Sequence, residues 1–163
     1  MSSRLVFFDL VKAMQRKHMQ LLCCADLNIR GYAAGTLFFQ RTPEDRRTQI
    51  ACLQLGRHDK VCIVQLPESE IEAFGRVLST NWKYGVSVNN KYGISGYKLE
   101  GQPWQSLETS HSLNIDAYKL VINILGYMES NGWSRVVPFD CSIDRAGADS
   151  LLFFRDESSA QHQ

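Results

Sequence analysis

The sequence lacks a long apolar run. Its first apolar stretch is interrupted after four residues by Asp9, whereas a secretory signal needs about 7–15 such residues. No stretch approaches the roughly 18 apolar residues that cross a membrane as a helix. We therefore expect no membrane association and a location in the cytoplasm or nucleus.

A bias in charge is also missing, because 18 basic residues face 17 acidic ones and the formal net charge is +1. No whole-molecule field therefore draws the chain towards nucleic acid. A local basic cluster is diluted by acidic neighbours and has no glycine-rich phosphate loop beside it. We interpret the cluster as the polar rim of a contact surface. Its members are Arg41, Arg46, Arg47 and Arg57.

The five cysteines show neither C-x-x-C spacing nor an even count. Metal fingers and disulfide frameworks are therefore not expected, and we predict reduced, buried thiols, no metal and no cofactor. Asp26 and Asp140, which occupy similar surroundings, are expected to cap turns. No convergent acid, base or nucleophile predicts a catalytic residue. A cysteine-dependent enzyme stays an alternative, with Cys141 as nucleophile and His111 as the nearest candidate base.

What the sequence does contain is internal similarity. Val6–Ile29 resembles Leu120–Ile143 at a constant offset of 114 residues, and Leu37-Phe38-Phe39 matches Leu152-Phe153-Phe154 after one inserted residue. Such self-similarity is typical of a structural unit used more than once. It predicts a duplicated helix–strand–strand unit, at about residues 4–41 and 118–155.

Apolar spacing predicts helices at Arg4–Lys17, Glu68–Asn81 and Asp116–Ser130. The second helix has Pro67 at its first turn and a capping box that starts at Ser69. Runs rich in Val, Ile, Leu and Phe between the helices predict about eight strands. Because strands follow one another in groups, we expect an α+β fold. The predicted domain spans residues 1–155, with a mainly antiparallel curved sheet, three helices on one face, and a flexible tail at 156–163.

The segment Trp82–Trp104 interleaves aromatic residues with glycines. That composition is typical of protein-binding surfaces, and aromatics dominate interface hot spots. The alternative is that the rings seal the core and the edge of the sheet. The predicted partner-binding residues are Trp82, Tyr84, Tyr92, Tyr97 and Trp104.

These observations favour a non-catalytic protein-interaction or assembly module that binds an unidentified protein partner. They leave self-association open. The first alternative is a small-molecule binding domain, with an apolar ligand held in a cleft between the two similar units. The second is the cysteine-dependent enzyme.

Overall fold

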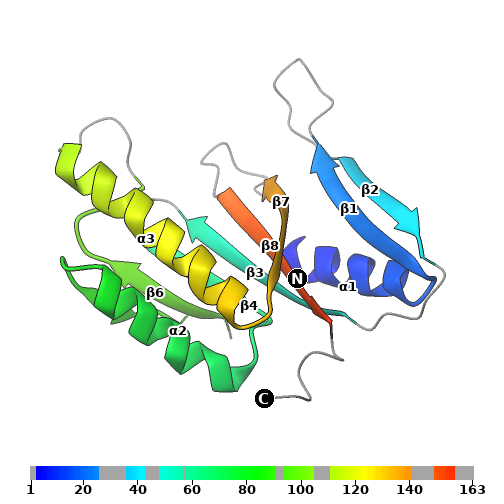
Figure 1. The fold of residues 1–163 in the computed structure, drawn as a ribbon, viewed down its shortest axis with the longest axis horizontal. Coiled ribbons are helices and arrows are strands. Elements are labelled where there is room, and N and C mark those ends of the chain that lie inside the picture. The colour runs from blue at the N-terminus through cyan, green and yellow to red at the C-terminus, as the bar shows by residue number, and fades with distance from the viewer. Residues whose placement is uncertain are drawn as a thin grey trace.

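The computed structural model describes residues 3–25, 36–42, 48–56, 58–90, 94–104, 111–140 and 149–156. Within them the chain forms three helices and eight strands, which confirms the predicted α+β class (Figure 1). The helices are α1 (Ser3–Gln15), α2 (Glu68–Asn81) and α3 (His111–Ser130). The strands are β1 (Met19–Ala25), β2 (Thr36–Arg41), β3 (Thr48–Gly56), β4 (Lys60–Val64), β5 (Val86–Val88), β6 (Ser95–Leu99), β7 (Ser134–Asp140) and β8 (Asp149–Asp156).

Six of these strands form one antiparallel sheet in the order β5-β6-β4-β3-β8-β7. Its centre is the long pairing of β3 with β8, in which Thr48 lies opposite Asp156 and Leu55 opposite Asp149. Strands β1 and β2 pair antiparallel in a sheet of their own, and β1 lies beside β7. The N-terminal hairpin therefore lies beside the β7 edge of the six-stranded sheet without joining it.

The front core lies between the sheet and helices α2 and α3. Successive side chains of a strand point to opposite faces, and β3 places Ala51 and Leu53 on the front. The helices cover them with residues that are 0–3% exposed, among them Leu78, Leu120 and Met128. Both helices are therefore amphipathic as expected, and each buries one face against the sheet.

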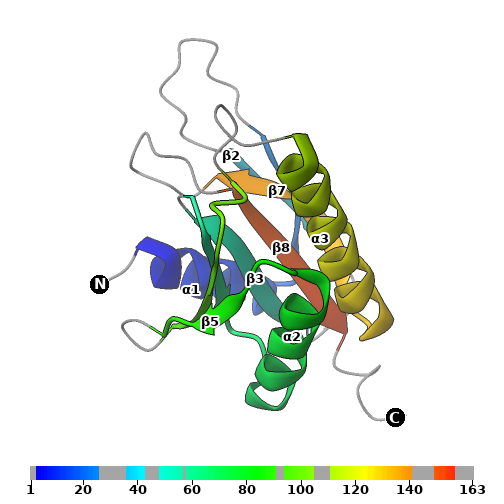
Figure 2. The same ribbon diagram turned by 90° about the vertical axis from the view of Figure 1, so that its left-hand side faces the viewer.

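The back of the same sheet carries a second core, covered by α1. Here β3 presents Ile50 and Cys52, and α1 packs Phe8 and Val11 on them. Figure 2 shows α1 on one side of β3 and β8, and α3 on the other. The expectation that all helices share one face was therefore wrong. Apolar spacing shows that a helix has a buried side, but it does not say which face of a sheet that side meets.

The start of α2 also differs from the prediction. Pro67 is the N-cap residue, and no side chain caps the helix. The predicted capping box does not form, because the helix begins at Glu68: Ser69 lies inside its first turn, and the Glu72 carboxylate accepts a hydrogen bond from Arg76. The neighbouring Glu70 carboxylate accepts hydrogen bonds from the Trp133 indole and the Arg155 guanidinium, so tertiary contacts hold that side chain.

Strand pairing in the two hairpins follows one numerical relation. In the first hairpin Leu21 pairs with Phe39, and in the second Arg135 pairs with Phe153. Each residue of the second pair lies 114 positions after its counterpart in the first. Cys24–Leu37 and Pro138–Leu151 are related in the same way. Both hairpins also have their register shift directly after the first of these pairs. The pairing needs no inserted residue, so the offset of 114 holds through both strands.

The helices that precede these two hairpins, α1 and α3, end in the same way at positions 114 residues apart. His18 after α1 and Gly132 after α3 both have positive φ, at 57° and 78°. The amide of His18 donates to the Gln15 carbonyl, and the amide of Gly132 donates to the Glu129 carbonyl. A left-handed residue at this point is a common helix stop. These coincidences support the duplication, which remains a proposal.

Candidate interaction surface

The aromatic segment contributes mainly to the core. Trp82 is 1% exposed, and its indole N–H donates to the Glu100 carbonyl at 2.9 Å. Tyr97 is 9% exposed, and its hydroxyl donates to the Ile71 carbonyl at 2.9 Å. Trp104 is half-buried against the front core. Since buried rings offer no surface to a partner, Trp82 and Tyr97 follow the core-sealing alternative. Composition could not reveal this, because Trp and Tyr suit interfaces and cores equally.

Tyr84 is the most exposed member of the set among the described residues, with 37% of its surface exposed. Its ring lies 5.0 Å from that of Trp82, and its hydroxyl donates to Asp116 Oδ2 at 3.0 Å. Lys83 Nζ lies 2.8 Å from the same carboxylate oxygen. Hydrogen bonds from Lys83 and Tyr84 lower the pKa of Asp116, and the bond to Asp116 raises the pKa of Lys83. This cluster ties the end of α2 to the start of α3.

Some predicted site residues lie outside the described part of the chain. They are Asp26, Arg46, Arg47, Arg57, Tyr92 and Cys141. Arg41 is exposed at the end of β2, while Asp140 ends β7 opposite Asp149. His111 begins α3. The polar rim stays a prediction, because Arg41 is its one member among the described residues.

Cysteine chemistry finds little support in the described residues. Cys52 is buried, and Cys23 and Cys62 are half-buried. The described ranges also contain no cluster of three or more metal-binding side chains. None of the described helices is long and apolar enough to span a membrane.

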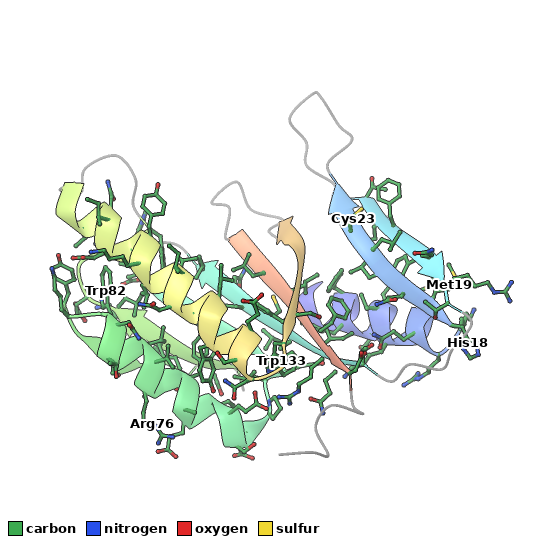
Figure 3. All side chains as sticks on the ribbon, in the orientation of Figure 1. His18, Met19, Cys23, Arg76, Trp82 and Trp133 are labelled. Atoms are coloured by element: carbon green, nitrogen blue, oxygen red, sulfur yellow. The ribbon has the colours of Figure 1, made fainter. Side chains whose placement is uncertain are left out.

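A buried polar network that the sequence did not reveal joins β8 to α2 and to the end of α3. The Arg155 guanidinium lies 4.3 Å from the centre of the Trp133 ring and 2.7 Å from Glu70 Oε1. It also donates to Gln49 Oε1 and to the Asn131 carbonyl. Figure 3 shows Trp133 at the C-terminal end of α3. Every group in this network has a partner, so it is a structural clamp.

The outer face of α3 carries three of the eight exposed large hydrophobic side chains of the described residues. Ile115, Tyr118 and Ile122 are 53%, 72% and 66% exposed, and Leu125 is half-buried. Residues three and four apart lie on one helix face, so the four form a continuous line, which we call the α3 stripe. Exposed apolar residues scattered singly need no explanation, whereas contiguous apolar patches are typical of interaction sites.

The α3 stripe points away from α2. Contacts between the two helices use Tyr127 against Phe74 and Asn123 against Asn81. Leu120 and Ile124 face the sheet. The stripe occupies the remaining flank, beyond which Figure 1 shows β7 and then β1. Tyr84, bound to Asp116, lies on the α2 flank and does not belong to the stripe.

Comparison with known proteins identifies a family but no activity. Residues 49–154, well over half of the chain, match a family model described only as a domain. The chain belongs to this family. No curated protein matches it. A solved structure described as a conserved kinetoplastid-specific protein from Trypanosoma cruzi is 13% identical and covers 66% of this chain and 96% of its own. Its TM-score is 0.40.

Proposed function

We infer that this protein is a non-catalytic protein-interaction or assembly module that binds through the α3 stripe. The observation that carries this proposal is the exposure of three large apolar side chains on one line of one helix. Helix faces of this spacing dock into apolar surfaces of partner proteins. Tyr118 adds an aromatic ring with a polar tip, the residue type that is enriched in binding hot spots.

The proposal moves the contact surface from the aromatic segment to α3. We further propose that the module works in the cytoplasm or nucleus. The odd number of cysteines and the lack of C-x-x-C spacing support that location, because such compartments keep cysteines reduced. The interaction function does not depend on the location.

Quantitative affinity capture from lysate tests the proposal, with the full chain as bait. Ile122→Glu places a charge in the middle of the stripe, and its matched control is Val88→Glu, because Val88 is 71% exposed on β5, away from α3. We expect a partner that wild type and Val88→Glu retain and Ile122→Glu loses. Equal retention by all three, with each shown to be folded, contradicts the assignment to α3.

Small-molecule binding has one observation in its favour. Gln54 is 3% exposed, and its Oε1 has no hydrogen-bond partner among the described residues. A buried acceptor without a partner costs about 1–3 kcal/mol, which a bound donor group would recover. A thermal-shift screen of small hydrogen-bond donors tests this candidate. Stabilisation of wild type that disappears in Gln54→Met supports it, and equal shifts in both proteins contradict it.

A further inference from the structure

The α3 stripe repeats a face that the first helix uses for packing. At the offset of 114, Ile122 corresponds to Phe8 and Leu125 to Val11. Phe8 and Val11 are 2% and 0% exposed under the back of the sheet. The equivalent line on α3 is therefore built like a packing face, but in a single copy of the described chain only Leu125 packs against the front core, and the rest of the line is exposed. A second protein surface is needed to bury it.

The spacing within the stripe limits what that surface can be. The intervals 115–118, 118–122 and 122–125 are three, four and three residues, so the line reads the same in both directions about position 120. A twofold interface requires a surface that is complementary to itself. Two antiparallel copies of α3 meet this requirement. Ile115 of one copy then faces Leu125 of the other, and Tyr118 faces Ile122.

Charge permits the same arrangement. The stripe contains no ionised side chain, and Asp116 is turned towards α2 by Lys83 and Tyr84. The formal net charge of +1 gives two copies almost no mutual repulsion. The exposed apolar residues Leu22 and Phe38, at 50% and 39%, lie on the hairpin beyond β7. They are available to extend the buried area.

We propose that the second occupant is another copy of this chain, and that the protein forms a twofold dimer through antiparallel α3 helices. The proposal rests on the interaction function inferred above and specifies its partner. Packing of this kind follows the ridges and grooves of any helix pair, with side chains from the two stripes interleaved.

Lys119 distinguishes a second copy from any other partner. It is exposed at the border of the stripe, one residue from the point about which the line is symmetric. In the proposed dimer the two Lys119 side chains lie close to the twofold axis and repel each other. Lys119→Gln should therefore tighten self-association by about two- to fivefold, the size of a surface charge effect. Added salt should reduce the difference between the two proteins.

Sedimentation equilibrium over micromolar to millimolar concentrations tests the dimer, using the full chain. We expect wild type and Val88→Glu to dimerise alike, Ile122→Glu to remain monomeric, and Lys119→Gln to associate more tightly. A wild-type monomer at the highest concentration overturns the proposal, as does an equal dimer in Ile122→Glu. In that case, affinity capture separates the two proposals. If wild type captures a partner that Ile122→Glu loses, the interaction function stands without self-association. If capture is also insensitive to Ile122→Glu, both proposals fail.

Discussion

The contact between Arg155 and Glu70 shows how much one residue can contribute in this fold. Both side chains are largely buried, with 12% and 17% of their surfaces exposed. Removing one partner of such a pair leaves a charge without compensation, which typically costs about 3–5 kcal/mol. Arg155 also stacks on Trp133 and donates to Gln49, which a lysine at this position could not reproduce together.

We expect Arg155→Met to lower the free energy of unfolding by about 3 kcal/mol, because the Glu70 carboxylate stays buried without its cation. Urea-induced unfolding measures this loss. Arg76→Met is the control, since Arg76 pairs with Glu72 while both are mostly exposed and, as Figure 3 shows, points away from α2. Its loss should stay below about 0.5 kcal/mol. Equal losses in the two variants would contradict the structural role of the clamp.

The Asp116 carboxyl provides a second test at the scale of one residue. Its folded pKa lies below the ordinary value of about 3.9 because Lys83 and Tyr84 donate hydrogen bonds to the ionised form. The contact therefore stabilises the fold above the unfolded pKa, and this contribution is lost as pH falls through the folded pKa. NMR titration of the carboxyl carbon should give a midpoint below the ordinary value. Lys83→Met should raise that midpoint, and no change would show that Lys83 does not contribute.

At the scale of the element, two helix glycines differ in a way that the sequence alone does not show. A Cβ on Gly75 in α2 would lie 2.4 Å from the Tyr97 hydroxyl and 2.8 Å from Tyr97 Cζ. A Cβ on Gly126 in α3 would meet nothing within 4 Å. The first glycine permits close approach of helix and sheet, while the second only weakens its helix.

We therefore expect opposite effects from the same substitution. Gly126→Ala should stabilise the protein by about 0.5–1 kcal/mol, because alanine is the better helix former. Gly75→Ala should destabilise it by about 1–3 kcal/mol, the usual cost of overpacking a core. Denaturant unfolding of the two variants gives the comparison. Stabilisation by both would mean that Tyr97 moves aside without cost.

The bounds of helices and strands were largely predictable from the sequence, but the surfaces against which these elements pack were not. The predicted bounds of α2 agree with those observed, because Pro67 and the spacing of Phe74 and Leu78 mark both its start and its face. In α3, however, Leu125 packs half-buried against the front core, while Ile115 and Ile122 are exposed. α3 carries apolar residues around most of its circumference, so spacing alone could not select the side that meets the sheet.

Long-range placement was beyond the sequence for a related reason. Gln49 and Arg155 are separated by most of the chain, yet β3 and β8 pair there. The repeat indicated that two hairpins resemble each other, but it did not show that α1 covers the face opposite to α3. The candidate surface followed the same pattern. Composition pointed to Trp82, which the structure buries, and burial alone revealed Ile115, Tyr118 and Ile122.

At the scale of the whole molecule, the central sheet depends on both of its covers. The family match spans residues 49–154 and so leaves out α1, β1 and β2. Yet α1 shields the back of β3 and β8, where Ile50, Leu152 and Phe154 are 3%, 1% and 4% exposed. The matched region by itself therefore has an apolar face that this chain covers with its own N-terminal unit.

Removing that unit should consequently disturb the part that remains. A version limited to residues 48–156 would expose the back core, and a newly exposed patch of this kind promotes aggregation and binding of hydrophobic dyes. We expect it to bind such a dye and to unfold at lower urea concentration than the full chain. Addition of a separate peptide covering residues 1–42 should reverse both effects, because it restores the Phe8 and Val11 contacts. If residues 48–156 unfold at the same midpoint as the full chain and bind no dye, α1 is not required to cover the sheet. The two cores would then be energetically independent although they share one sheet.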